Sequence, residues 1–286
     1  LLLVLGYLTA SARVLPERAP VDAPDTAFSS GRAMLDVVAM SRRAHPPGSP
    51  EHARVRAHLL DRLTDLGLEP EVQTATSLRR RGGTATAVTV RNVLARVPGT
   101  ESTGAIVLTA HYDARGIARG AGDDATGVAT ILETLRAVRS GPPLRNDLIV
   151  LLTDAEELGL MGARAFVEEH PWMEDVAVVL SFEMRGGGGP AIMFETGSEN
   201  GWIIDALRSG DPRPFANSLS LEVYRRMPND TDFSPFRDRG VQGLNFAGIG
   251  RAPVYHQAWD APQHVSEATL QHHGVQLLSL TRALAQ

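Results

Sequence analysis

Three consecutive stretches decide the fold: AIVLTAHYD at residues 105–113, GVATILETLRAV at residues 127–138 and DLIVLLT at residues 147–153. Residues 105–110 and 147–153 are almost continuous apolar runs, which is typical of strands buried on both faces of a parallel sheet. The stretch between them has apolar residues at helical spacing and predicts an amphipathic helix. A strand, a helix and a further strand in this order form the unit of an α/β fold.

The same alternation continues toward the C-terminus. Sequence patterns predict strands over residues 176–182, 190–195, 220–224 and 243–247, and helices over residues 162–169, 202–208, 232–237 and 266–284. We therefore expect an α/β fold with a mixed, mostly parallel central sheet flanked by helices on both faces. Residues 26–286 are long enough to form one large domain with a full core.

The N-terminal part is predicted to contain two helices followed by a β-hairpin. Apolar spacing predicts helices over residues 27–44 and 50–66, with Ser49 as the N-cap of the second. Alternating residues predict strands over residues 68–76 and 84–97. The run from Arg79 to Gly83 between them predicts an exposed hairpin loop, and we interpret its arginines as a solvated turn rather than a binding patch.

Residues 1–25 are expected to lie outside this domain. Residues 1–8, LLLVLGYL, are apolar but too short to cross a bilayer. We interpret them as the end of a truncated membrane anchor or signal segment, with a frayed apolar terminus as the alternative. The polar, proline-rich residues 13–25 are typical of a linker.

Composition limits the classes of partner and ligand. The formal net charge is -5 and the basic residues are scattered, whereas a nucleic-acid surface needs clustered lysine and arginine. Cysteine is absent, so the chain offers no disulfide and no thiolate ligand. Any bound metal must therefore rely on histidine, aspartate and glutamate.

Such residues gather where the predicted strands end. His111 is either a hydrogen-bonded structural histidine or a metal ligand whose second ring nitrogen is held by the Asp113 carboxylate. The glycine-rich loop that follows ends in two acids. Asp124 can cap the next helix, and a carboxylate here can also bridge two cations. We assign the bridge to Asp123, with Asp124 or Thr126 ordering the turn.

Two adjacent acids follow the strand that ends at residue 153. A Glu-Glu pair at a helix entry is usually no more than a charged first turn. In a zinc site the pair can divide the chemistry, because Glu157 can bind metal while Glu156 acts as general base toward a metal-bound water.

Later positions supply what this cluster lacks. Glu183 either binds a second metal or forms a salt bridge with Arg185, and His256, beside Tyr255, is the expected last ligand. Two more acids are expected to hold the loop or to bind a substrate amine, namely Asp232 and Asp260. We interpret the other histidines as solvated: His45, His52, His58, His170, His264, His272 and His273.

The motifs between Thr109 and His256 together resemble peptidase family M28, the aminopeptidase-like and glutamate-carboxypeptidase-like zinc enzymes. Members carry, in this order, a His-x-Asp, a Gly-Ala-Asp-Asp-x-Ala-Ser-Gly-like loop, a Glu-Glu pair, a later acid and a Tyr-His. Each motif is weak alone, but five in the right order are highly specific. The resemblance implies the zinc-dependent exopeptidase fold, with residues 26–286 as the peptidase domain.

The resemblance also implies a function, which we state as an expectation. It implies two zinc ions per chain, hydrolysis of peptide bonds at chain termini by a metal-activated water, and most simply an aminopeptidase. The implied roles are one metal on His111, Asp123 and Glu183, the other on Asp123, Glu157 and His256, Glu156 as general base, Tyr255 near the oxyanion and Asp113 behind His111. The alternatives are a single-zinc acyltransferase resembling glutaminyl cyclase and a receptor-like ectodomain without metals.

Two departures from the common family pattern point to a subgroup. Gly122 stands where many relatives have the first Asp, and Glu183 stands where many have Asp. Glu183 and the glycine-rich run at residues 186–189 resemble the membrane-bound proteases related to the endoplasmic reticulum metallopeptidase, as do residues 28–33 and 45–49. The resemblance implies peptide substrates, membrane association through the N-terminus and an extracytoplasmic domain, or otherwise secretion.

Overall fold

A computed structural model describes residues 15–210 and 213–286. The apolar residues 1–8, in which we expect a membrane anchor, therefore lie outside the described residues. Within the described part, none of the helices combines the length and the apolar character that crossing a membrane requires. Part of the expected linker is held against the domain, because the Ala19 N–H lies 3.2 Å from Oε1 of Gln271.

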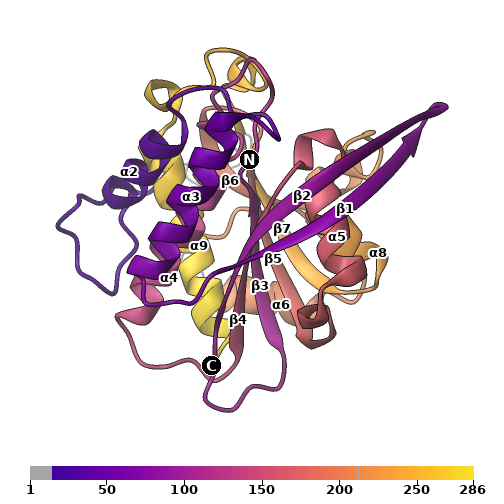
Figure 1. Ribbon diagram of the computed structural model, residues 1–286. Helices are drawn as coiled ribbons and strands as arrows, with labels where there is room; N and C mark the ends of the chain where they lie inside the picture. The colour runs from indigo at the N-terminus through magenta and orange to yellow at the C-terminus, as the bar shows by residue number, and fades with distance from the viewer. Residues whose placement is uncertain (1–14, 211–212) are drawn as a thin grey trace, which may run out of the picture.

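A central sheet organises the described residues (Figure 1). Its seven strands, in the order β1-β2-β4-β3-β5-β7-β6, are β1 (Glu71–Arg81), β2 (Thr84–Val97), β3 (Ala105–His111), β4 (Asp147–Thr153), β5 (Val176–Met184), β6 (Gly188–Thr196) and β7 (Gln242–Gly250). The central strands β4, β3, β5 and β7 are parallel, and β2 and β6 pair with them antiparallel. The expected mixed α/β fold is confirmed.

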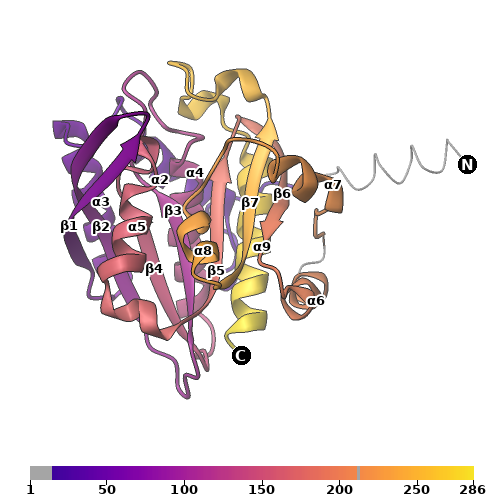
Figure 2. The same cartoon turned by 90° about the vertical axis from the view of Figure 1, so that its right-hand side faces the viewer.

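Helices cover both faces of the sheet (Figure 2). On one face pack α2 (Ser30–Met40), α3 (Pro50–Asp65), α4 (Ala125–Arg139) and α9 (Glu267–Leu284), with α6 (Gly201–Gly210) beside α9. On the other lie α5 (Met161–Glu169) and α8 (Phe233–Asp238), while α7 (Ser218–Tyr224) packs on β6. Short 3-10 turns complete the described elements: η1 (Glu156–Leu158), η2 (Pro171–Asp175), η3 (Ala252–Val254) and η4 (Pro262–His264).

Two of the strands that lead to the candidate site, β3 and β4, are buried from end to end. Every residue of β3 and β4 is buried, as their apolar runs predict. Their parallel register pairs His111 with Thr153, so the segments that follow both strands leave the same edge of the sheet. Asp124 caps α4, because its Oδ1 accepts a hydrogen bond of 2.9 Å from the Gly127 N–H. Ser49 likewise caps α3, as predicted.

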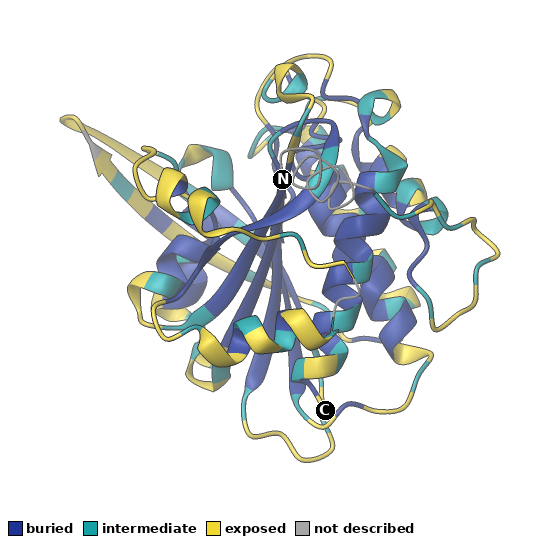
Figure 3. Cartoon of the chain, turned by 180° about the vertical axis from the view of Figure 1, so that it is seen from behind, coloured by how far each residue is buried: buried dark blue, intermediate teal, exposed yellow. Residues whose placement is uncertain are grey.

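Two elements differ from the sequence-based expectation. Residues 220–224 are not a strand but part of α7, whose N-terminus is capped by the Asn217 side chain. The basic run is not a loop either, because Arg79 lies within β1 and the turn consists of Gly82 and Gly83. Both glycines have positive φ, 55° and 81°, which suits a two-residue hairpin turn. The exposed tip of this hairpin projects beyond the sheet (Figure 3). The other predicted elements are confirmed, with ends shifted by a few residues.

Candidate metal centre

The predicted site residues meet at the carboxyl edge of the parallel strands. His111 ends β3, Glu156 and Glu157 follow β4 in η1, and Glu183 lies one residue before the end of β5. Asp123 lies just before α4, in the loop that leaves β3. Ligands of open α/β sheets commonly bind at this edge.

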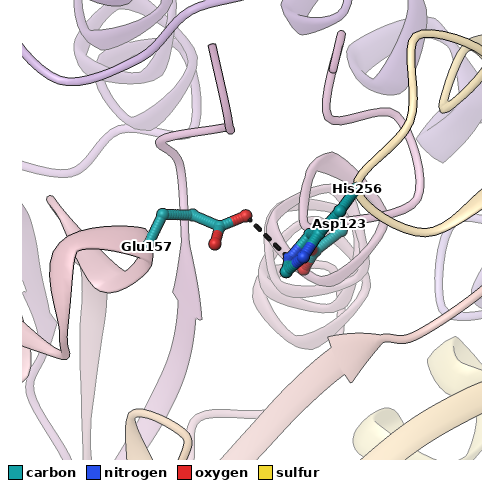
Figure 4. A group of neighbouring side chains, drawn as sticks. All are labelled: Asp123, Glu157 and His256. Atoms are coloured by element: carbon teal, nitrogen blue, oxygen red, sulfur yellow. Dashed lines mark ion pairs between the residues drawn. The ribbon is translucent and has the colours of Figure 1, made fainter. Parts of the chain in front are cut away.

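Asp123 lies between two imidazoles. Its Oδ1 is 3.1 Å from Nε2 of His111, and its Oδ2 is 3.1 Å from Nε2 of His256. The same His256 nitrogen is 3.1 Å from Oε1 of Glu157, the contact drawn in Figure 4. One ligand atom from each of Asp123, Glu157 and His256 lies within 4.8 Å of the others. A carboxylate with one oxygen toward each histidine has the arrangement of a bridging ligand.

The donors fit zinc in kind and in spacing. Zinc bonds of about 2.0–2.2 Å to nitrogen and oxygen place neighbouring ligand atoms of a tetrahedron about 3.3 Å apart, close to the 3.1 Å contacts here. Among the described residues, Oε1 of Glu183 is buried at this centre without a hydrogen-bond partner, while Oε1 of Glu157 and Nε2 of His256 form an ion pair at 3.1 Å. Because an unpaired buried carboxylate oxygen is costly, a cation at the centre would suit Glu183.

Burial and crowding of acidic groups perturb the pKa values at the centre. Burial raises the pKa of Glu183 to about 7, although the nearby Arg185 cation opposes the shift. Burial also raises the pKa of Glu156 well above its ordinary value, and the carboxylates of Glu183 and Asp232 add to the effect. The pKa of His256 rises to about 9, because its contacts with Asp123 and Glu157 outweigh burial. Crowded carboxylates with perturbed pKa values are typical of functional sites.

Asp113 acts through its backbone as well as its side chain. The carbonyl oxygen of Asp113 lies 3.0 Å from Nδ1 of His111, whereas its carboxylate is 3.5 Å away. Because a carbonyl can only accept, Nδ1 donates its proton to it, and Nε2 is the ring nitrogen that faces Asp123. The carboxylate accepts the backbone N–H groups of Glu156 at 2.9 Å and Glu157 at 3.2 Å. Asp113 thus links His111 to the glutamate pair.

Asp260 holds the loop that carries Asp123. Its carboxylate accepts hydrogen bonds from the N–H of Gly122 at 2.6 Å and of Asp123 at 3.2 Å. A Cβ at position 122 would lie 2.9 Å from the Gly186 carbonyl oxygen and 3.0 Å from Oδ1 of Asp260. This close approach favours glycine at position 122. Thr126 also orders the turn, donating its hydroxyl to the Ala121 carbonyl at 2.9 Å.

Asp232 is buried and accepts a hydrogen bond from the Thr153 hydroxyl, while its other oxygen has no hydrogen-bond partner among the described residues. Burial raises the pKa of Asp232 to about 6. This carboxylate is not among the residues that line the cavity beside the metal centre. A role in binding a substrate amine therefore finds no support in its position.

Of the two interpretations of Glu183, the structure shows the salt bridge, and Glu183 lies outside the ligand group that Asp123, Glu157 and His256 form among the described residues. Oε2 of Glu183 pairs with Nη2 of Arg185 at 3.3 Å, which is the salt bridge, while its Oε1 stays unpartnered among the described residues. Nη1 of Arg185 donates to the Tyr255 hydroxyl at 3.1 Å. The Tyr255 ring stacks on His256 with ring centroids 3.6 Å apart. Arg185 thus connects the two halves of the centre.

Several histidines interpreted as solvated are buried, which corrects that interpretation: His45, His52, His272 and His273. His52 pairs with Oδ1 of Asp154 at 3.0 Å and stacks on Tyr112, so it braces the segments next to His111 and Glu156. Sequence reasoning missed this network. The signal was available, because His52 stands at helical spacing from Val55 on the buried face of α3.

A cavity of about 390 Å³ opens beside the centre. Glu156, Glu157, Tyr255 and His256 form part of its wall, so the proposed base and ligands are accessible to a small substrate. Its other charged lining residues are Arg79, Arg115, Arg164, Arg185 and Asp230.

Comparison with known proteins identifies relatives by sequence. The model of peptidase family M28 matches residues 92–281. "Endoplasmic reticulum metallopeptidase 1" of Mus musculus is 32% identical over 201 residues, which cover 68% of this chain and 22% of the relative. "Vacuolar membrane protease" of Eremothecium gossypii is 30% identical over 274 residues, which cover 88% and 27%. The chain thus spans about a quarter of the length of the curated relatives it matches.

Solved structures show the same fold. The aminopeptidase from Aneurinibacillus sp. strain AM-1 has a TM-score of 0.74 at 14% identity, over 90% of this chain and 94% of that one. The glutaminyl cyclase of Porphyromonas gingivalis has a TM-score of 0.72 at 19% identity, over 88% and 97%. At these identities the likeness concerns the fold alone, and it includes both a peptidase and an acyltransferase.

Proposed function

The chain belongs to peptidase family M28, and on that premise we propose that it is a zinc-dependent exopeptidase that acts as an aminopeptidase on peptides. The observation that carries the proposal is the Asp123 carboxylate, with His111 at one oxygen and His256 at the other. Glu157 completes one ligand group, and Glu156 lies in the cavity wall beside it.

We assign the ligands in two overlapping sets. His111, Asp123 and Glu183 would hold one zinc ion, and Asp123, Glu157 and His256 the other. When bound, zinc polarises carbonyl groups and lowers the pKa of water toward neutrality. The buried Oε1 of Glu183, which has no hydrogen bond among the described residues, supports the first set. The spacing of Asp123, Glu157 and His256, whose ligand atoms lie within 4.8 Å of one another, supports the second.

The protein's own groups supply proton transfer and orientation. Glu156 takes a proton from the attacking water and passes it to the leaving amine, and burial raises the pKa of its carboxyl group, which favours its holding a proton. Its backbone N–H is fixed by Asp113, which limits its orientations. The Tyr255 hydroxyl accepts a hydrogen bond from Arg185, so its own proton can donate to the developing oxyanion.

A second candidate is a single-zinc acyltransferase, which the fold shared with glutaminyl cyclases favours. Metal content separates the two. We expect purified protein to bind about two divalent ions per chain and to hydrolyse aminoacyl-4-nitroanilides in a chelator-sensitive manner. Asp123→Ala should lose most of both ions, whereas the exposed Asp205→Ala should lose neither.

Other outcomes would contradict the proposal. One tightly bound ion, unchanged by added zinc, would favour the acyltransferase. No bound ion and no hydrolysis would favour a receptor-like ectodomain without metals.

We further propose that residues 26–286 are the peptidase domain and that the protein works at a membrane, with this domain extracytoplasmic. The names of the curated relatives, which include a vacuolar membrane protease, support the membrane association. Protease protection of the protein in sealed vesicles from its own cells tests the topology. Resistance to added protease, lost on detergent treatment, is the expected result, and digestion without detergent would contradict it.

A further inference from the structure

Among the described residues, four arginines line the cavity beside the metal centre: Arg79, Arg115, Arg164 and Arg185. Arg79 comes from β1 and Arg164 from α5, while Arg115 follows β3 and Arg185 follows β5. Segments distant in sequence therefore bring guanidinium groups to the wall that also carries Glu156 and Glu157.

Two of these arginines have carboxylate partners within the centre. Nε of Arg115 lies 2.8 Å from Oε2 of Glu157, and Arg185 pairs with Glu183. Their charges are therefore engaged with proposed metal ligands.

The other two have no carboxylate partner in the described part of the chain. Nη1 of Arg79 donates to the Leu158 carbonyl oxygen at 3.1 Å. For the Arg164 side chain the described residues provide neither a hydrogen bond nor an ion pair. Because arginine remains charged at any physiological pH, the wall of the cavity holds two cations that an anion can approach.

Arg79 is held in place rather than loosely solvated. A Cβ at position 159 would lie 2.4 Å from its Nη1, so the guanidinium packs directly on the Gly159 backbone, next to the turn that holds the glutamate pair. Gly159 has a φ of 116°, which also favours glycine at this position. The position of Arg79 corrects the expectation that the basic run is only a solvated turn.

We propose that Arg79 and Arg164 bind a carboxylate of the substrate, so that the enzyme prefers peptides with an acidic group close to the scissile bond. A planar guanidinium binds a carboxylate through two parallel hydrogen bonds, which suits this role. The carboxylate is either an acidic side chain or the free C-terminus of a short peptide. This inference rests on the proposed exopeptidase function and names its substrate class.

Matched peptide pairs test the preference and identify its source. Leu-Ala against Leu-Ala-NH2 reports a C-terminal carboxylate, while Leu-Glu-NH2 against Leu-Gln-NH2 reports an acidic side chain. We expect kcat/KM for the acidic member of at least one pair to exceed that of its neutral partner by about 10- to 100-fold, the range of hydrogen bonds to charged groups.

Variants of the two arginines test whether Arg79 and Arg164 bind the substrate carboxylate. Arg79→Gln and Arg164→Gln should each lower the acid-to-neutral ratio toward one. Arg80→Gln is the matched control, because it removes the same charge from the neighbouring, exposed residue of β1, and it should keep the ratio. A ratio near one in both pairs, or a ratio that both cavity variants preserve, would overturn the inference.

A binding measurement separates this inference from the proposed activity. Zinc-loaded Glu156→Gln protein is titrated calorimetrically with Leu-Ala-Glu and with Leu-Ala-Gln-NH2, which requires no turnover. We expect the acidic peptide to bind about tenfold more tightly or better, and Arg79→Gln with Arg164→Gln to remove the difference. Equal affinities, or no binding of either peptide, would overturn the inference, even where chelator-sensitive hydrolysis of neutral substrates upholds the exopeptidase.

Discussion

At the scale of single residues, the sharpest division of labour lies within the glutamate pair. Glu157 contacts His256 and belongs to the metal group, whereas Glu156 lines the cavity without belonging to that group. We predict that Glu156→Gln keeps its metal and its fold but loses about 10²–10⁴-fold in kcat, because glutamine cannot take the proton. Glu157→Gln should lose zinc instead, and added zinc should partly restore its activity.

Steady-state kinetics and zinc analysis of the same preparations test this prediction. An active Glu156→Gln protein beside an inactive Glu157→Gln protein that keeps its metal would show that the two roles are exchanged.

The sequence predicted which residue types gather at the centre better than which atoms meet. His111, Asp123, Glu157 and His256 do come together, because each stands at the end of a strand or in a loop over the same edge of the sheet. That Asp113 holds His111 through a backbone carbonyl depends on the path of the chain after β3, which no side-chain pattern records.

At the scale of elements, the N-cap of α3 at Ser49 was predicted from the sequence, and its contribution to stability can be tested. Oγ of Ser49 accepts the His52 N–H at 3.1 Å and begins α3, which presents His52 and Val55 to the interior. We predict that Ser49→Ala lowers the free energy of unfolding by about 1 kcal/mol, measured by urea denaturation with an unchanged m-value. Ser49→Asp retains a capping oxygen and should stay close to the wild type. Equal losses in both variants would show that the cap oxygen is not the source of the stability.

Elements with strong burial were predicted more securely than short or charged ones. β3 and β4 are apolar throughout, which leaves little ambiguity. In residues 220–224, apolar and polar residues alternate over too few positions to distinguish a strand from a short helix. In the structure they belong to α7, whose N-terminus is capped by Asn217. β1 continues through Arg79 because ladder hydrogen bonds do not depend on whether a side chain is charged.

At the scale of the whole molecule, the order of strands and helices sufficed to predict the fold class. The docking of the N-terminal segment was not predictable. Gln271 of α9 accepts the N–H of Ser30 at 2.9 Å and donates to the Phe28 carbonyl at 3.1 Å. These contacts join the two ends of the domain, and a contact between residues so distant in sequence leaves no local pattern.

The loss of stability of the domain toward acidic pH should depend in part on one buried imidazole, that of His273. His273 is fully buried against Phe182, and burial lowers its pKa to about 3. The unfolded chain restores an ordinary pKa of about 6.5. Between these values the unfolded state binds more protons, so stability falls as the pH drops.

We predict that the free energy of unfolding of His273→Leu falls less steeply from pH 7 to pH 4 than that of the wild type. The difference should reach up to about 1.4 kcal/mol per pH unit, measured by urea denaturation. Parallel curves for the two proteins would show that His273 is not the source of this acid sensitivity.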